Sequence, residues 1–553
     1  MAVENLITEH IDIWTSAIKT KSTSGRGSSK KLELYGVKKL RELILELAVR
    51  GKLVPQDAND EPVATLLKQN HVEQSRLTVE ENLKTKASQS ILDSEEYILV
   101  PETWGRIKLG NLAKFIDYRG KTPKKLSAGV RLITAKNVKF GYLSLQPEEF
   151  ISEAEYKTWM TRGFPRIGDI LFTPEAPLGN VAQVDLEEKF ALAQRAICLQ
   201  FHLSDISNYL RLFLMSPSFQ NLLSEKATGT TAKGIKASVL KELVVYIPPI
   251  EEQHRIVAKV DELMALCDQL EQQTEASIEA HQVLVATLLD TLCNSADANE
   301  LMQNWARISE HFDTLFTTEE SIDQLKQTIL QLAVMGKLVP QDPSDEPAAE
   351  LLKRIAEDGD SPKKVRLTKP ISESEEPLTL PTGWVFTRLE SIIQISSGKN
   401  LTAKKMDSNG TIPVYGGNGV TGYHSENNVS EPTIVIGRVG FYCGSVHLTP
   451  KKAWVTDNAF VTKFSHSNLN LEFLFWLLKA TNLNENDSAT AQPVISGRKV
   501  YPIVVGLPPL NEQARIVAKL NELMAMCDFL KQSFSEHTST QLLLTNTIVE
   551  HAV

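Results

Sequence analysis

The sequence predicts an α+β fold of duplicated, pseudo-twofold architecture, in which two small α/β domains are separated by long antiparallel helices that form a coiled-coil frame. Three observations predict this fold. Two pairs of segments are near copies of each other, helical apolar spacing runs through the copied segments, and the stretches between them carry short strand-like runs. A chain of 553 residues is long enough for about three or four units.

The copied segments alternate with unlike segments. Residues 43–57 read LILELAVRGKLVPQD and residues 328–342 read TILQLAVMGKLVPQD. Residues 247–270 read IPPIEEQHRIVAKVDELMALCDQL and residues 507–530 read LPPLNEQARIVAKLNELMAMCDFL. The order is therefore A-X-B-A-Y-B, in which A and B are duplicated and X and Y have diverged. We expect helical frame segments at 1–98, 251–378 and 510–553, and α/β domains at 99–250 and 379–509.

The frame segments have the apolar spacing of amphipathic helices. In the first B segment Ile256, Val260, Leu263 and Cys267 recur at helical intervals, and about 40 residues of such helix would span roughly 60 Å. Each A helix ends in a glycine that is followed four residues later by proline, a typical helix stop. Because the order is duplicated, equivalent helices require equivalent partners. We therefore predict that the C-terminal B segment pairs with the N-terminal A segment. The alternative is two ordinary helical hairpins in separate domains.

The charge is unevenly distributed. The whole chain has a net charge of −9, but 20 basic against 14 acidic residues in 99–250 give +6. In 379–509, 11 basic against 8 acidic residues give +3, so the frame carries −18. This split indicates that the inserts face phosphates and that the frame faces proteins.

Several classes of function are excluded by missing motifs. The sequence contains no GxxxxGK[ST] or HExxH motif, and its five cysteines form no CxxC pair. Residues 417–422 fit GxGxxG, but a loop-like HSENN follows where a dinucleotide site needs a helix. We therefore predict no catalytic residue, no metal site and no cofactor in this chain. Without a long apolar run or a secretory signal, we expect a cytoplasmic protein that does not enter a membrane.

Nucleic-acid binding is the chemistry that the inserts favour. A basic loop beside Gly and Pro can approach a DNA backbone closely, and Asn, Gln and Arg side chains can form bidentate bonds with purine edges. A solvated basic loop is the alternative for each such stretch. In X the candidates are Arg119, Lys121, Thr122, Lys124, Lys125, Lys136, Asn137, Gln194, Arg195 and Lys233. In Y they are Lys399, Asn400, Lys404, Lys405, Tyr415, Asn418, Arg438, Arg498 and Lys499.

The chain resembles the specificity subunits of type I restriction-modification systems. The resemblance rests on the duplicated LAVxGKLVPQD and PPxxEQxRIVAKxxELMAxCD stretches and on their order along nearly the whole chain. Shorter stretches in X (117–123 and 168–172) and in Y (413–419 and 455–459) are similar to segments of the family's recognition domains.

The resemblance implies a non-catalytic DNA-reading subunit. Each insert would read one half of a split, asymmetric site in double-stranded DNA, and the helices would set the gap. The frame would dock two methyltransferase subunits, and restriction subunits would join that core. S-adenosylmethionine, ATP and Mg would then belong to those partners.

Two other functions remain open at this point. The chain could serve a restriction assembly whose partner fuses methyltransferase and nuclease, which only the partner's sequence would reveal. It could also be a coiled-coil structural protein with carbohydrate- or protein-binding inserts. Salt-dependent DNA binding would separate this last reading from the others.

Overall fold

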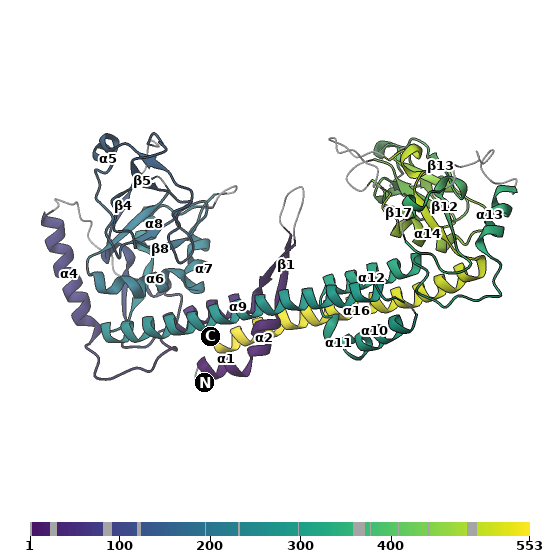
Figure 1. The fold of residues 1–553 in the computed structure, drawn as a ribbon. Coiled ribbons are helices and arrows are strands. Elements are labelled where there is room, and N and C mark those ends of the chain that lie inside the picture. Colours follow the sequence, from purple (N-terminus) through teal and green to yellow (C-terminus); the bar gives the residue numbers. More distant parts are fainter. Residues whose placement is uncertain are drawn as a thin grey trace. The chain divides into compact units, whose positions relative to one another are not determined.

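The computed structural model forms two compact units, which are Met1–Ser277 together with His537–Val553, and Ile278–Glu536. Each unit contains one sheet-bearing domain and part of both long helices, α9 (Ile250–Cys293) and α16 (Leu510–Ala552) (Figure 1). This organisation confirms the predicted α+β class and its duplicated architecture. The described residues are 3–22, 30–80, 91–118, 123–193, 195–229, 233–296, 298–357, 371–376, 378–407, 409–439, 443–483 and 495–553.

The first domain contains a four-stranded antiparallel sheet in the order β4-β10-β7-β8. A second sheet has the order β6-β5-β9, in which β5 and β9 are parallel, and a two-stranded ribbon pairs β11 with β3. The strands are β3 Gly105–Lys108, β4 Ala113–Asp117, β5 Val130–Ile133, β6 Phe150–Ile151, β7 Ile170–Phe172, β8 Val181–Gln183, β9 Phe190–Leu192, β10 Ile197–Phe201 and β11 Val244–Ile247. Because β10 and β11 are buried at every position, their sequences ICLQF and VVYI are mainly apolar and do not alternate with polar residues.

The second domain repeats this topology strand for strand. Its sheets have the orders β13-β19-β16-β17 and β15-β14-β18, and its ribbon pairs β12 with β20, so adding nine to each strand number of the first domain gives the second. The strands are β12 Val385–Arg388, β13 Gln394–Ser397, β14 Ile412–Gly416, β15 Gly419–His424, β16 Ile434–Gly437, β17 Val446–Leu448, β18 Trp454–Val455, β19 Ala459–Lys463 and β20 Val504–Leu507. Two sequences that look unlike each other therefore share one domain plan.

The remaining elements are mainly helical. An N-terminal hairpin pairs β1 (Ile18–Ser22) with β2 (Lys30–Leu34). The domain helices are α5 Glu153–Trp159, α6 Ser207–Met215, α7 Pro217–Lys226, α8 Ala237–Glu242, α14 Leu471–Ala480 and α15 Gly497–Val500. The shorter frame helices are α1 Val3–Glu9, α2 Ile11–Ser16, α3 Tyr35–Val49, α4 Val63–Glu80, α10 Ala298–Glu310, α11 Phe312–Leu315, α12 Glu319–Val334 and α13 Ala348–Glu357.

The long helices bury the apolar stripe that the sequence predicts. The equivalent positions 256/516, 260/520, 263/523 and 267/527 are all buried. The glycines that end the A helices have nearly equal positive φ angles, +67° at Gly51 and +69° at Gly336, which residues other than glycine rarely adopt. The helix-ending backbone conformation and the buried positions of the long helices are thus both duplicated.

The A and B segments contact one another within each unit. In the first unit Arg41 on α3 pairs with Asp268 on α9 at 2.6 Å, and the Tyr35 hydroxyl donates to Asn546 Oδ1 on α16 at 2.7 Å. The second of these contacts joins the N-terminal A segment to the C-terminal B helix, as the predicted closure requires. In the second unit Lys531 on α16 binds Asp323 on α12 at 2.9 Å.

A buried tryptophan–glutamate pair joins each domain to its frame helix. The Trp104 indole N–H lies 3.1 Å from both carboxylate oxygens of Glu252, and the Trp384 indole N–H donates to Glu512 at 3.0 Å. Burial raises the pKa of each glutamate, against the lowering effect of the hydrogen bonds it accepts. Because the folded chain binds protons at these groups more readily than the unfolded chain, their contribution to stability falls as pH rises from the unfolded pKa to the folded pKa.

We expect glutamine at 252 and 512 to be tolerated, because an amide oxygen still accepts the indole hydrogen bond and carries no buried charge. The midpoint of urea unfolding at pH 7 should stay equal or rise, and this part of the pH dependence should disappear. Alanine at either position should lower the free energy of unfolding by about 1–3 kcal/mol, because the buried indole N–H loses its acceptor. Glu279→Gln, on an exposed position of α9, is the control. Equal losses for glutamine and alanine would contradict this account.

Candidate nucleic-acid interface

Three chain segments meet at one edge of each four-stranded sheet. In the first domain β4 ends at Asp117 and β7 ends at Phe172, and both residues pair with Ile197 at the start of β10. In the second domain the ends of β13 and β16 meet the start of β19 in the same way. The loops that follow β4 and β7 and the connection that precedes β10 must therefore emerge at the same edge, as do their counterparts in the second domain. This edge carries many of the predicted residues.

Four polar residues converge at this edge of the second domain. The Arg438 guanidinium lies 3.5 Å from both Ser397 Oγ and the Asp457 carbonyl oxygen, and its centre is 5.4 Å from the Phe460 ring. Asn400 donates from Nδ2 to Asp457 Oδ2 at 3.2 Å. The structure thus brings together two residues that the sequence singled out, Asn400 and Arg438, around Asp457.

The cations near this cluster are mostly exposed. Lys399 is exposed, and its backbone N–H donates to the Val455 carbonyl at 2.9 Å, which holds its loop beside the β18–β19 connection. Lys404 and Lys405 are exposed in a short 3-10 turn at Ala403–Lys405. In α15, Arg498 is exposed and Lys499 is half-buried. This helix begins two residues after Ile495, whose backbone N–H donates to the Arg438 carbonyl at 2.9 Å.

Asn418 lies exposed in the tight turn between β14 and β15. Its neighbour Gly417 approaches the backbone so closely that an added Cβ would lie 2.6 Å from the Val439 carbonyl oxygen. The GxGxxG stretch is therefore part of a β-hairpin, as its sequence context indicates, and no helix follows it to hold a dinucleotide.

Tyr415 does not belong to the interface. Its side chain is buried in β14, where its hydroxyl donates to the Leu448 carbonyl at 3.3 Å and its ring lies 6.4 Å from that of His447. We therefore leave Tyr415 out of the proposed DNA contacts and assign its side chain to the domain core.

In the first domain the edge carries an exposed ion pair. Arg195, between β9 and β10, lies with Nε 3.1 Å from Glu175 Oε1 in the loop after β7. Gly234 forms an isolated β-bridge with Glu175, so the exposed Lys233 lies beside the same loop. Gln194, Arg119, Lys121 and Thr122 lie outside the described residues.

The other predicted cations of the first domain differ in their surroundings. Lys125 pairs with Glu149 at 2.7 Å, whereas Lys124 is held through its backbone N–H, which donates to Glu155 at 2.8 Å. Lys136 is exposed in the turn after β5. We retain these lysines in the proposed interface.

Asn137 is a structural residue in this fold. It is only 1% exposed, its Oδ1 accepts from Thr134, and its Nδ2 donates to the carbonyls of Ser144 and Pro147 at 3.0 and 3.1 Å. An amide that holds a turn in this way is not free to read a base edge. We therefore remove Asn137, with Tyr415, from the set of proposed DNA contacts.

Sequence reasoning missed the acidic and amide partners at this edge, Glu175, Asp457 and Asn458. Asp457 is half-buried and Asn458 exposed in the β18–β19 connection. The stretch 455–459 was one of those similar to the family's recognition domains, and this similarity was the available clue. A search for cations alone passes over it.

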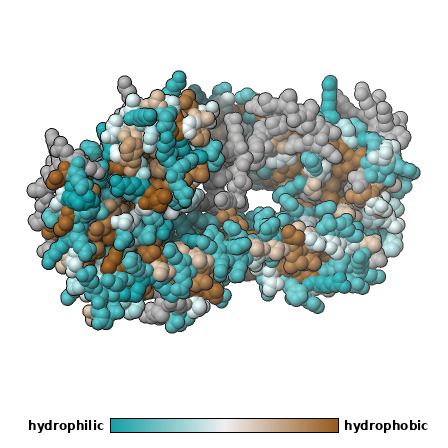
Figure 2. All heavy atoms as spheres, turned by 60° about the vertical axis from the view of Figure 1, so that its left-hand side comes forward, coloured by the Kyte–Doolittle hydropathy of each residue, from teal (hydrophilic) through white to brown (hydrophobic). Residues whose placement is uncertain are grey.

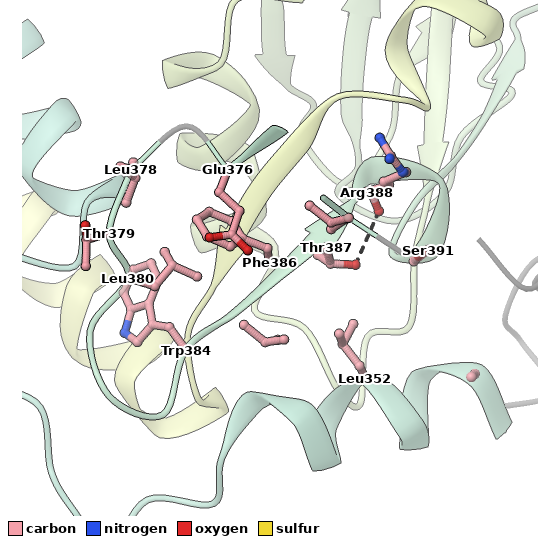
Figure 3. A pocket seen from close by; sticks show the side chains of 13 residues that line it. Leu352, Glu376, Leu378, Thr379, Leu380, Trp384, Phe386, Thr387, Arg388 and Ser391 are labelled. Carbon is pink, nitrogen blue, oxygen red and sulfur yellow. Dashed lines mark hydrogen bonds between the residues drawn. The ribbon is translucent and has the colours of Figure 1, made fainter. Parts of the chain in front are cut away.

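A pocket of about 730 Å³ lies elsewhere in the second unit, lined by Leu352 on α13, Leu380, Trp384 and Phe386 (Figure 3). In the first unit the strand position that matches Gly506 is Tyr246, whose ring packs against Tyr97 at 5.7 Å. The second copy lacks this aromatic side chain beside its tryptophan. Because none of the residues that line the pocket lies on the loops at the sheet edge, we leave it outside the candidate interface.

The described ranges contain neither a metal cluster nor a membrane-spanning helix. No group of three or more His, Cys, Asp or Glu side chains there could hold a metal ion. No helix among those residues is both long enough and apolar enough to cross a membrane. The five cysteines are buried free thiols.

Comparisons with known proteins agree with the duplicated plan. The family model for the type I restriction modification DNA specificity domain matches residues 101–280 and 381–536. The chain is 37% identical to the type I restriction enzyme EcoAI specificity subunit of Escherichia coli over 599 aligned positions that cover all of both chains. It is 34% identical to the EcoEI specificity subunit of the same organism, again over the full length of both. The chain therefore belongs to the specificity subunits of type I restriction-modification systems, the non-catalytic members that supply DNA recognition.

Proposed function

We propose that each α/β domain reads one half of an asymmetric, bipartite site in double-stranded DNA, while the helical frame sets the gap between the halves. The observation that carries this proposal is one domain plan present twice, with different polar residues at the equivalent sheet edges. Two domains with the same fold can dock on DNA in the same way, and different residues at their sheet edges can recognise different half-sites. We keep 99–250 and 379–509 as the extent of the two domains.

The charge distribution supports contact with phosphates. The two domains carry +6 and +3, and the exposed lysines Lys124, Lys136, Lys399, Lys404 and Lys405 are placed on loops. Phosphate contacts position a protein on the duplex without reading sequence. We assign these lysines that role, together with Arg119, Lys121, Lys233, Arg498 and Lys499.

We further propose that the frame docks two methyltransferase subunits at equivalent places. The exposed fractions of Val283 and Leu284 on α9 are 62% and 49%, and those of Leu543 and Leu544 at the equivalent positions of α16 are 67% and 41%. Hydrophobic residues also interrupt the mainly hydrophilic surface on the face shown in Figure 2. Apolar pairs that are exposed equally in both copies fit a partner that binds twice.

The partners would carry the chemistry. Methyltransferase subunits would hold S-adenosylmethionine and methylate adenine, and restriction subunits would use ATP and Mg. The complete assembly would act on DNA in the cytoplasm.

Mapping methylated adenines across the genome tests this function. Cells that express the chain with its methyltransferase are compared with cells that express the methyltransferase alone. We expect a split motif with two unlike halves and a fixed gap, seen only when the chain is present. No new motif with a demonstrably active methyltransferase would overturn the proposal and favour a different assembly or a structural role.

A further inference from the structure

Matching hydrogen bonds align the loops that follow β7 and β16. In the first domain Thr173 exchanges backbone hydrogen bonds with Asn180 and Gly179, and in the second Gly437 exchanges them with Ser445 and Gly444, all at 2.8–2.9 Å. The next residue in each loop then accepts from an incoming isoleucine at 2.9 Å. The accepting and donating pairs are Pro174 with Ile235, and Arg438 with Ile495. Pro174 and Arg438 are therefore equivalent positions, which the sequences do not reveal.

The connections that precede β10 and β19 align in the same way. Ala193 donates to the Ile133 carbonyl at 2.8 Å, and Thr456 donates to the Tyr415 carbonyl at 2.9 Å. Counting forward from these bonds to β10 and β19 makes Arg195 equivalent to Asn458.

This alignment shows that the arginines occupy opposite loops in the two domains. In the first domain Arg195 lies on the connection before β10, and its acidic partner Glu175 lies on the loop after β7. In the second domain Arg438 lies on the loop after β16, and its guanidinium contacts the backbone carbonyl of Asp457 on the connection before β19. The same edge thus presents one arginine in each domain, with an oxygen acceptor on the opposite loop.

Neither arginine is tied down by its present partners. The Arg195–Glu175 pair has side chains that are 62% and 47% exposed, and exposed ion pairs are weak. Among the described residues, the Arg438 guanidinium forms hydrogen bonds only at 3.5 Å, and its buried Nε finds no hydrogen-bond partner there. A guanidinium fork held loosely over an aromatic ring can turn toward a better acceptor.

The backbone of the first edge is strained. Among the described residues other than glycine, positive φ angles occur at Ala176 (+38°) and Arg195 (+65°), and both flank the ion pair. Residues other than glycine rarely adopt positive φ angles, and such backbone strain is concentrated at binding sites. Glycine at 195 would relieve this strain, because glycine adopts positive φ without a steric penalty.

We propose that Arg195 and Arg438 each read one guanine in the major groove through its O6 and N7 atoms, from opposite loops of the same edge. This assignment rests on the proposed function and adds to it a base and a position in each half-site. Bidentate binding of guanine is the specific contact that an arginine fork fits best. The Glu175 carboxylate and the Asp457 backbone carbonyl hold the arginines at this edge when DNA is absent. Each half-site should therefore contain at least one G·C pair that depends on a single arginine.

The test uses the full chain in complex with its methyltransferase and duplexes in which each base pair of the mapped site is changed in turn. We expect Arg195→Gln and Arg438→Gln each to lose about tenfold or more discrimination at one G·C pair of one half-site, with the other half-site unchanged. Arg195→Lys and Arg438→Lys should lose the same discrimination, because lysine keeps the charge but lacks the fork. Arg195→Gly should have a melting temperature equal to or above that of the parent, which separates recognition from folding.

Lys405→Gln is the matched control for a phosphate contact and should weaken binding to all duplexes equally, with a shallower salt dependence. The same uniform loss in the arginine variants would overturn the assignment, as would unchanged discrimination or a half-site without a G·C pair. Failure of the proposed function would appear differently, as the absence of any split motif for the unaltered chain.

Discussion

Glutamate at Val283, Leu284, Leu543 and Leu544 together is expected to release both methyltransferase subunits from the complex. Burying one such side chain contributes about 1.5–3 kcal/mol, so losing two at each site should weaken each docking contact by at least about 100-fold. The buried charge of an introduced glutamate adds to this loss. Size-exclusion chromatography with light scattering measures the result as the mass of the complex.

Variants in one copy of the frame make this prediction sharper. Val283→Glu with Leu284→Glu should leave one methyltransferase subunit bound, and the equivalent change at 543 and 544 should do the same. Val79→Glu, at an apolar residue of α4 that is 82% exposed, is the control and should leave both subunits bound. A complex that keeps full mass after the fourfold change, with the chain still folded by circular dichroism, would refute docking at these residues.

Inserting one helical turn into each long helix is expected to lengthen the gap of the recognised site and to leave both half-sites unchanged. The boundaries between the compact units fall after Ser277 in α9 and after Glu536 in α16. In the alignment of the two repeats, these boundary positions are offset by one residue. Four residues add about 6 Å to a helix, which corresponds to roughly two base pairs. Methylation at the original spacing should fall to background, while the same two halves appear with a longer gap.

Methylation mapping in cells measures this outcome, and the position of the insertion supplies its control. Four residues added in the connection between α13 and the 3-10 turn at Glu373–Glu375 leave the long helices unaltered and should leave the gap unchanged. An unchanged gap with altered half-sites after the helix insertions would contradict the role of the helices as a ruler.

Much of the frame was predictable because its determinants are local. Helical apolar spacing places Ile256 and Cys267 on the buried face, and both are fully buried. Gly51 and Gly336 end their helices because the αL conformation favours glycine. Because these sequence patterns occur twice, they also imply that equivalent residues make the same contacts in both copies. The Trp104–Glu252 and Trp384–Glu512 hydrogen bonds are such a pair of equivalent contacts.

The interface was only partly predictable because residue type does not determine burial. Asn137 and Tyr415 have side chains suited to reading bases, yet one holds a turn and the other packs in a core. Conversely, Glu175 and Asp457 carry the wrong charge for a phosphate site and are passed over by a search for cations. Only contacts between distant segments show that these two residues accompany the arginines, Glu175 through its carboxylate and Asp457 through its backbone carbonyl.

The sequence by itself determined the duplicated helical frame, the two basic inserts and the family, because repeats, periodicity and charge can be recognised without knowing which segments contact each other. Tertiary structure decided that both inserts share one topology and that Arg195 and Arg438 lie on opposite loops of equivalent edges. The physical reason is that strand order and loop alignment depend on backbone hydrogen bonds between segments far apart in the chain. Many side-chain sequences satisfy the same backbone pattern, so diverged inserts conceal the plan that their hydrogen bonds preserve.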